Sequence, residues 1–189
     1  AIWIGALLCC ALLAVNCRTD IVGGYELGLV QKHFGKLVLF LCISLIQSTI
    51  ITLGDVFVLG VHPVNFPLML GCSVLTSVTF TILIFTLVSL FGNVGKAIAV
   101  IMMVFQIAGA GGIYPIQTNP TIFGLLEPLW PFSYAINLFR EAIAGPVQSA
   151  VVYNMRAMFV FMFVFLIAAV LKKRLHIWNE FFESVYEQA

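Results

Sequence analysis

The sequence is 189 residues long, with 62% hydrophobic residues, 9% charged residues and a mean hydropathy of +1.11. A single domain in water would have too little interior to bury so many apolar side chains, so the composition excludes an ordinary soluble domain and indicates an integral membrane protein. The formal net charge of +1 gives no indication of nucleic-acid binding.

Long apolar blocks recur along the chain, each close to the length of about 20 residues that a helix needs to cross ~30 Å of hydrocarbon. Spanning β-barrels would instead show alternating segments of about ten residues. The sequence therefore predicts an all-α fold, a polytopic transmembrane helical bundle. Its five predicted spans, within one membrane domain over 1–171, lie at about residues 1–17, 37–60, 68–91, 97–116 and 151–171.

The chain begins with Ala1, inside an apolar block and without a preceding basic region. We therefore expect it to be the tail of a longer protein, and we do not interpret the first block as a cleaved signal peptide. The five cysteines lie within or at the end of apolar blocks, so we interpret them as packing residues.

Lysine and arginine collect on one side of the predicted spans. If the odd-numbered spans descend into the cytoplasm, only Arg140 and Arg156 lie outside, and all the other lysines and arginines lie inside. Because cytoplasmic loops carry the excess of positive charge, we place the start of the chain outside and the C-terminus in the cytoplasm of the cell.

Two cytoplasmic pieces are predicted. The segment "RTDIVGGYELGLVQKHFGK" has mixed charge and a short helical pattern from Tyr25 to Phe34, so it is either a docking surface for a cytoplasmic partner or a solvated connector. The tail, residues 172–189, places apolar residues on one helical face and glutamates on the other. This pattern predicts an amphipathic helix on the inner membrane surface or on a partner.

Polar residues form stripes on the spans. The stripe on the second span consists of Ser44, Ser48, Thr52 and Asp55, with Gln47 beside it, and the stripe on the third consists of Ser73, Ser77 and Thr81. Buried Ser and Thr most often serve packing and interhelical hydrogen bonds, whereas Gln47 and Gln106 are costlier to bury and are candidates for a polar path. The candidates for a transport path or for buried polar contacts are Gln47, Ser48, Thr52, Asp55, Gln106 and Arg140.

The fourth span ends in "AGAGGIYPIQTNP", where glycines allow close backbone approach and prolines stop the helix. The connection that follows is too long for a simple loop and too apolar for a solvated one. Its helical pieces, the second starting at Pro131, are shorter than a span. We expect a re-entrant hairpin at about 121–145 that dips into the outer leaflet. Its predicted turn residues are Gly109, Gly111, Gly112, Pro115 and Pro131.

No catalytic or metal-binding pattern is present in the sequence. The three histidines, His33, His62 and His176, are scattered over loops and the tail, without the spacing that would hold a metal. No acid, base or nucleophile has a partner near it in the sequence. We therefore expect no enzyme activity and no cofactor, and if nucleotide energy is used, another polypeptide hydrolyses it.

The stretch "LVSLFGNVGKAIAVIMMVFQIAGAGGIYPIQTNPTIFGLLEPLWPFSYAINLFREAIAG" resembles the C-terminal membrane domain of the phage-infection-protein (YhgE/Pip) family, which is related to ABC-2 export permeases. The resemblance extends over nearly the whole chain. The positions that carry the wider similarity are Gly111, Gly112, Pro115, Pro131, Tyr134, Arg140 and Gly145. It implies that Tyr134 also belongs to the re-entrant turn.

The resemblance implies a bacterial plasma membrane protein with an extracytoplasmic domain upstream of Ala1. It also implies a dimer or paired permease half, a separate ATPase subunit, and a coupling segment in the cytoplasmic loop. The candidate coupling residues are Tyr25, Glu26 and Lys32. Family members are known as phage-adsorption factors, and relatives include an accessory component of type VII secretion.

Two functional hypotheses remain open on the sequence. The first is a permease-like domain of an export or secretion system, powered by a separate ATPase. The second is a membrane anchor or scaffold that presents an extracytoplasmic domain without transporting anything, and on this second hypothesis the polar stripes are packing surfaces only.

Overall fold

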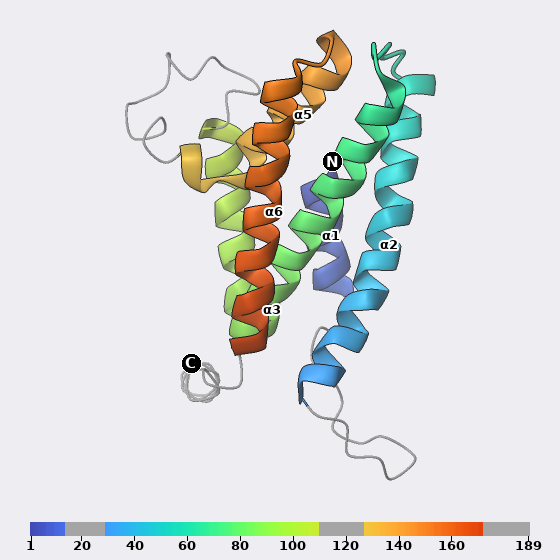
Figure 1. Ribbon diagram of the computed structural model, residues 1–189. Coiled ribbons are helices and arrows are strands. Elements are labelled where there is room, and N and C mark those ends of the chain that lie inside the picture. Colours follow the sequence, from blue (N-terminus) through green and yellow to red (C-terminus); the bar gives the residue numbers. More distant parts are fainter. Residues whose placement is uncertain (14–28, 110–126, 172–189) are drawn as a thin grey trace.

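The computed structural model describes residues 1–13, 29–109 and 127–171 (Figure 1). This part of the chain contains helices and no β-strand, so the predicted all-α fold is confirmed for it. The elements are α1 (Ile2–Leu12), α2 (Leu29–Phe57), α3 (Phe66–Gly109), the 3₁₀ turn η2 (Glu127–Leu129), α5 (Pro131–Ala144) and α6 (Gln148–Leu171).

Helix α3 is the centre of the bundle, because it contacts α1, α2, α5 and α6. The most apolar stretch of α3 is 67% buried, whereas the corresponding stretches of α2 and α6 are 28% and 17% buried. Among the described residues, three helices are long and apolar enough to cross a membrane, namely Phe34–Phe57 in α2, Phe66–Ile107 in α3 and Gln148–Leu171 in α6. The helices α2 and α6 therefore present most of their apolar surface outward.

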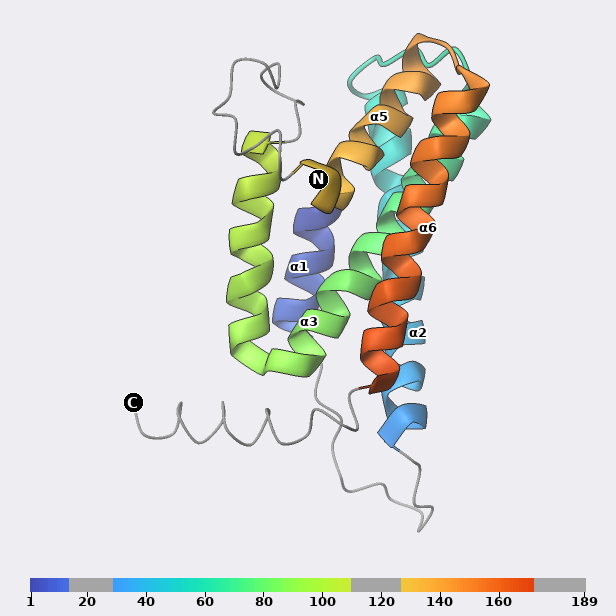
Figure 2. The same ribbon diagram turned by 60° about the vertical axis from the view of Figure 1, so that its left-hand side comes forward.

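The long helix α3 is broken at Gly92, whose backbone angles (φ 57°, ψ −128°) are not helical. Figure 2 shows that the chain reverses there, so that residues 66–91 and residues 93–109 form two arms of α3 that diverge from the turn. A Cβ atom on Gly95 would lie 2.2 Å from the carbonyl oxygen of Leu87. The "FGNVGK" stretch therefore forms a tight turn in which Gly92 supplies the positive φ and Gly95 supplies the space.

The two ends of the bundle are held differently. One end, which we call the turn end, carries Gly92, and the opposite end, the loop end, carries residues 58–65 and the junction between α5 and α6 (Figure 1). At the loop end the backbone N–H groups of Val64 and Asn65 donate to the carbonyls of Ile143 and Ala142, at 3.4 Å and 3.2 Å. These bonds satisfy carbonyls that the last turn of α5 leaves free.

Asn65 has a second role at the loop end, because its side-chain oxygen accepts a hydrogen bond of 3.0 Å from the backbone N–H of Leu68. This is an N-cap on α3. Sequence reasoning missed it, although an asparagine followed by Pro67 at the start of an apolar block is a helix-start signal. One residue thus fixes the start of α3 and ties it to the end of α5.

The helix boundaries differ from the predicted spans. Helices α2 and α6 begin at Leu29 and Gln148, before the predicted 37 and 151, because hydropathy marks where side chains meet lipid while backbone hydrogen bonding continues into polar residues. Helix α1 is 11 residues long, about 16 Å, and ends before an extended Leu13. The last residues of the predicted span 1–17, and those of the span 97–116, lie outside the described residues.

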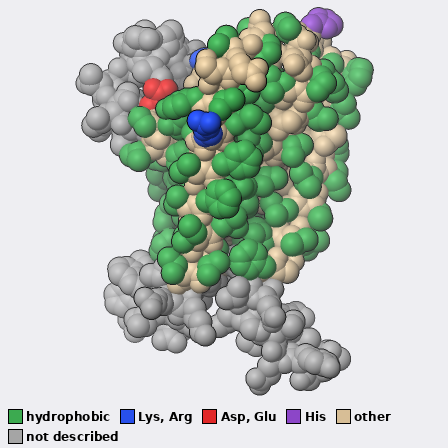
Figure 3. Space-filling view, in the orientation of Figure 1, with side chains coloured by type: hydrophobic (Ala, Val, Ile, Leu, Met, Phe, Trp, Pro, Cys, Tyr) green, Lys and Arg blue, Asp and Glu red, His purple; other side chains and the backbone are tan. Residues whose placement is uncertain are grey.

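The outer surface of the bundle is apolar. In Figure 3 hydrophobic side chains cover most of the face toward the viewer, and the few charged side chains visible lie toward the loop end. On α2, for example, Ile46 and Ile50 are 62% and 63% exposed. Large apolar side chains over this much surface are suited to a lipid environment, which agrees with the composition.

Candidate functional site

The predicted polar stripes of α2 and α3 face each other and form a line of hydrogen bonds, which we call the hydroxyl seam (Ser44, Ser48, Ser73, Ser77 and Thr81). The Ser77 hydroxyl donates to the Ser44 carbonyl at 2.9 Å, and the Ser44 hydroxyl donates to the Ser77 carbonyl at 3.2 Å. The two hydroxyls also hydrogen-bond to each other. The Thr81 hydroxyl donates to Ser44 Oγ at 2.7 Å, and the Ser73 hydroxyl donates to the Ser48 carbonyl at 3.3 Å.

All five seam residues are buried, and their hydroxyls bond to helix backbone or to one another. The Thr52 hydroxyl donates to the Ser48 carbonyl on its own helix at 2.9 Å. Small side chains let two helix backbones approach closely, and each interhelical hydrogen bond adds to the contact. Ser48 and Thr52 therefore lie at a closed helix interface, where they have packing partners.

Gln47 points away from the seam and toward α1. A Cβ atom on Gly5 would lie 1.3 Å from Gln47 Nε2, so the amide occupies the space that the missing side chain leaves. Trp3, two residues earlier on α1, is 2% exposed and packs edge-on against Phe80 of α3, with ring centroids 4.8 Å apart. The side chain of Gln47 is thus part of the contact between α1 and α2.

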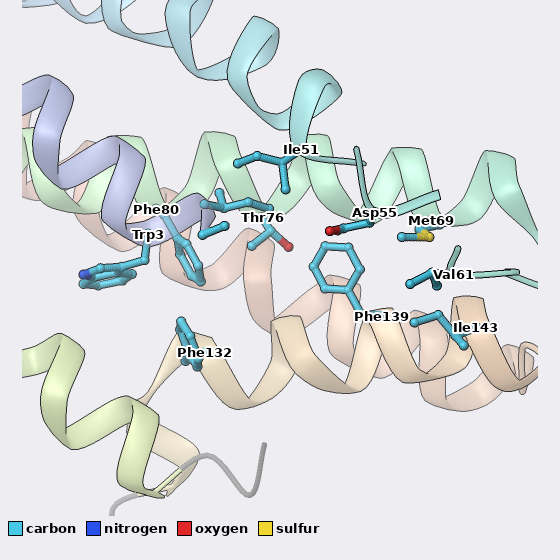
Figure 4. A pocket seen from close by; sticks show the side chains of 12 residues that line it. Trp3, Ile51, Asp55, Val61, Met69, Thr76, Phe80, Phe132, Phe139 and Ile143 are labelled. Atoms are coloured by element: carbon cyan, nitrogen blue, oxygen red, sulfur yellow. The ribbon is translucent and has the colours of Figure 1, made fainter. Parts of the chain in front are cut away.

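A cavity of about 290 Å³ lies between α1, α2, α3 and α5. Figure 4 shows its lining, which is mostly apolar, with Asp55 and Thr76 as polar side chains. The lining residues are Ala1, Ile2, Trp3, Ile51, Asp55, Val61, Met69, Thr76, Phe80, Phe132, Phe139 and Ile143. Asp55, a sequence candidate, is therefore placed at a cavity and not in the seam.

Thr76 was not singled out in the sequence, yet its position is unusual. The side chain is 1% exposed, and its hydroxyl has no hydrogen-bond partner among the described residues. It follows Leu75 and precedes the seam residue Ser77, so the neighbouring hydroxyls point to different sides of α3. Because α3 is buried on several sides, its residue pattern alone does not show which hydroxyls meet α2.

Helix α5 begins deep in the bundle and rises to the loop end. Its first turn contacts the middle of α3, since Phe132 stacks on Phe80 with ring centroids 5.8 Å apart and an interplanar angle of 6°. Its last turn accepts the N–H bonds from the loop between α2 and α3. At 14 residues, about 21 Å, it is too short to cross a membrane by itself.

The start of α5 carries two predicted turn residues. The structure has Pro131 at the first turn of the helix, as the sequence predicted. The Tyr134 hydroxyl donates to the Pro128 carbonyl at 3.2 Å, and its ring lies near Tyr153 and Phe161 of α6.

The charged residues of α5 lie toward its C-terminal end. Arg140 is exposed and hydrogen-bonds to the Asn137 side chain at 3.5 Å, while the Glu141 carboxylate accepts a 2.7 Å bond from the backbone N–H of Val147. Glu141 thereby fixes the junction with α6. Arg140 is not among the residues that line the cavity.

Gln106 lies on the returning arm of α3, three residues before Gly109, where the described helix ends. Its side chain is fully buried, and neither of its amide atoms has a hydrogen-bond partner within the described ranges. Such a group is costly to bury unpaired. It does not belong to the seam, and it does not line the cavity.

Several predicted site residues lie outside the described residues. These are Gly111, Gly112 and Pro115 of the predicted re-entrant turn, and Tyr25 and Glu26 of the predicted coupling segment. Lys32 lies in the first turns of α2, but its side chain is also outside the description. Over the described ranges, no group of three or more His, Cys, Asp or Glu residues is arranged to hold a metal.

Comparison with known proteins gives two matches. Residues 30–171 match the family described as "ABC-2 family transporter protein". A stretch of 115 residues, 61% of this chain, is 29% identical to the "Uncharacterized protein YhgE" of Bacillus subtilis (strain 168), of which it covers 15%. The chain thus matches a small part of a much longer relative. No solved structure matches.

Proposed function

We propose that this chain, which belongs to the ABC-2 family of transporter proteins, is the permease-like membrane domain of an export or secretion system. The family assignment and the apolar helices place it in a membrane. The similarity to YhgE relates it to the YhgE/Pip branch. On this proposal the protein is a transport component and not an enzyme.

The course of α5 is the observation that carries the proposal. A helix that starts beside Phe80 at mid-depth, ends at the loop between α2 and α3, and is too short to cross fits a re-entrant segment. Together with α1, α2, the two arms of α3 and α6, this gives five spans and one dipping helix. A broken helix at membrane depth is tolerated where it is covered by protein or borders a cavity, and α5 forms one wall of the cavity.

The candidate path residues separate into two groups. Ser48 and Thr52 are used in helix packing, so we assign them to the closed interface. Asp55 lies at the cavity, and the buried amide of Gln106 has no partner among the described residues, so these two are better candidates for groups that meet a substrate or a second copy of the chain. A pair of copies that share a path between them is the expected arrangement.

Orientation and energy supply complete the proposal. The loop end faces outward and the turn end faces the cytoplasm, because most lysines and arginines fall on the cytoplasmic side in this arrangement. An ATPase subunit then binds at the cytoplasmic segment that contains Tyr25, Glu26 and Lys32. An extracytoplasmic domain upstream of Ala1 belongs to the same full-length protein, in a bacterial plasma membrane.

The test is purification of the full-length protein with its membrane neighbours, followed by a search for an ATPase that co-purifies. We expect one, and we expect that replacing Tyr25, Glu26 and Lys32 together by alanine releases it. The matched control replaces His62, Asn137 and Arg156, which lie in the half of the bundle toward the loop end, away from the proposed cytoplasmic side. The proposal fails if no ATPase is bound and the reconstituted protein moves neither lipid nor polymer nor peptide.

The second candidate function is a non-transporting anchor or scaffold that presents an extracytoplasmic domain for phage adsorption or as an accessory component of type VII secretion. The fully bonded hydroxyl seam favours it, because those polar groups are occupied by each other. Substituting Asp55 and Gln106 together separates the two functions. An anchor keeps its function if it still folds, whereas a permease loses transport.

A further inference from the structure

Helix α6 carries one basic residue, Arg156, and its side chain is exposed. The residues one turn before it and one turn after it on the same face are also exposed, and all of them are apolar or aromatic: Val152, Tyr153, Phe159 and Val160. Figure 3 shows a basic side chain among hydrophobic ones on this side of α6. Because the most apolar stretch of α6 is only 17% buried, this side of the helix is suited to face lipid.

The position of Arg156 along α6 places its backbone inside the hydrocarbon layer. The described helix ends at Leu171, and the basic run "KKR" follows directly in the sequence and marks one membrane surface. A thickness of ~30 Å corresponds to about 20 helical residues, so the opposite surface lies near Val152. The Cα atom of Arg156 is then about four residues, or about 6 Å, below that surface.

A charged side chain at this depth requires a counter-charge. Within the described ranges, the Arg156 guanidinium has neither a hydrogen bond nor an ion pair with another residue. The acidic residue closest to it in the sequence, Glu141, accepts a hydrogen bond from the backbone N–H of Val147. The counter-charge therefore has to come from a molecule on the exposed side of α6.

Helix geometry directs the Arg156 side chain toward the loop end. The Cα–Cβ bonds of an α-helix tilt toward its N-terminus, and α6 begins at the loop end (Figure 1). We therefore expect the side chain to extend over Val152 and Tyr153, and it is long enough to bring the guanidinium up to the headgroup level. Tyr153 is 64% exposed, and its ring lies 6.1 Å from that of Tyr134. Tyrosines are typical of this level of a membrane.

A phosphate is the anion that a lipid supplies at the headgroup level, and a guanidinium can donate to two of its oxygens at once. We propose that Arg156, with Tyr153 beside it, binds the phosphate of an anionic phospholipid in the leaflet at the loop end. The acyl chains of this lipid lie along the exposed side chains of Phe159, Val160 and Phe163. A lipid with a net negative charge is favoured over a zwitterionic one, because no ammonium group of its own headgroup neutralises the phosphate.

The inference goes beyond the proposed function, because lipid binding at α6 requires neither transport nor an ATPase. Only the identification of the loop-end leaflet as the outer one rests on the proposed orientation. A failed search for an ATPase leaves the lipid site intact. Failure of the lipid experiment likewise leaves the transport proposal intact.

The experiment uses the full-length protein in vesicles of equal amounts of phosphatidylglycerol and phosphatidylcholine with the same acyl chains. In one preparation the phosphatidylglycerol carries a photoactivatable group next to its phosphate, and in the other the phosphatidylcholine carries it. After illumination, mass spectrometry counts the lipid attached to the peptide that contains Tyr153. Arg156→Gln removes the charge and Arg156→Lys keeps it. The matched control is Arg140→Gln, which removes an exposed positive charge at the same end of the bundle, on α5.

In the wild type and in Arg140→Gln, we expect about fivefold more label from phosphatidylglycerol than from phosphatidylcholine. The ratio should fall to near one in Arg156→Gln and lie between the two in Arg156→Lys, which keeps the charge but loses the two-oxygen contact. A ratio near one in the wild type overturns the proposal, and this measurement needs no variant to fold.

Three further results also overturn the proposal. The first is an unchanged ratio in Arg156→Gln. The second is an equal fall in Arg140→Gln, since a general loss of surface charge would then explain the result. The third is the absence of any lipid label on this peptide, which would mean that another protein surface covers this side of α6.

Discussion

Helix α3 makes two contrasting kinds of contact on its different sides. At the hydroxyl seam, Ser77 exchanges hydrogen bonds with Ser44 of α2, and Thr81 adds another. One residue earlier, Thr76 is equally buried, but its hydroxyl has no partner among the described residues and it lines a cavity. Of these two adjacent side chains with similar chemistry, Ser77 therefore lies in an interface whose hydroxyls are hydrogen-bonded. Thr76 lies at a cavity, where its hydroxyl has no partner among the described residues.

The difference shows where the bundle is complete and where it is not. Buried hydroxyls that are paired rigidify a helix contact, so α2 and the first arm of α3 are expected to move as one body. Unpaired groups beside a cavity mark the side on which another element or another molecule is expected. The loop-end half of the cavity, between α2 and α5, is that side.

The largest effect on stability is expected from Gly95→Ala, at the closely packed turn of α3. The new Cβ would lie 2.2 Å from the carbonyl oxygen of Leu87 and 2.9 Å from Val88 Cα, both of which are backbone atoms. The turn at Gly92 would have to open, and we expect a loss of about 3 kcal/mol or more of stability. The measurement is the folded fraction of the full-length protein in detergent.

Gly71→Ala is the control for this substitution. Gly71 lies on the same helix, and an added Cβ meets nothing within 4 Å. We expect it to be neutral or to stabilise by up to about 1 kcal/mol, because alanine is the better helix former. Equal losses for the two variants would show that the turn does not depend on close contact.

The next effect is expected from Ser77→Val, within the seam. It removes the bonds to Ser44 and adds a methyl group where two helices are in close contact, at an expected cost of about 1 to 3 kcal/mol. Thr79→Val is the control, because in the described part of the chain the Thr79 hydroxyl bonds only to the Leu75 carbonyl of its own helix. The free energy of unfolding in detergent should change by less than about 0.5 kcal/mol in that control.

Part of this arrangement was predictable from the sequence. Serines and threonines four residues apart lie on one face of a helix, so the spacing of Ser44 and Ser48 on α2, and of Ser73 and Ser77 on α3, is enough to indicate interhelical bonds. Pro131 marked the start of α5 correctly, because its ring fits the first turn of a helix. Both signals depend only on residues that lie close together in the sequence.

The rest depended on three-dimensional packing. Thr76, Ser77 and Thr79 look alike in sequence, but α3 is buried on several sides, so periodicity does not tell which of them meets a partner. Gln47 was a candidate for a polar path, and its placement against Gly5 follows from the crossing of α1 and α2. A single sequence does not show how two helices cross or which residues meet at the crossing.

A smaller effect is expected from Gly5→Ala, at the contact between α1 and α2. Its Cβ would displace the end of the Gln47 side chain, which is flexible and can move. We expect a loss of about 0.5 to 1.5 kcal/mol. The double variant with Gln47→Ala should recover most of it, and a double-mutant cycle on the unfolding free energy measures the coupling. Additive losses would contradict the contact.

The smallest effect is expected from Thr76→Val, which keeps the side-chain shape and removes the unpaired hydroxyl at the cavity. Since no bond is lost among the described residues, the unfolding free energy should change by no more than about 0.5 kcal/mol, with stabilisation as the favoured direction. The measurement belongs in the full-length protein, beside Ser77→Val as the reference. A loss as large as that of Ser77→Val would mean that the hydroxyl has a partner from beyond the described residues. In that case the cavity side would be as completely bonded as the seam.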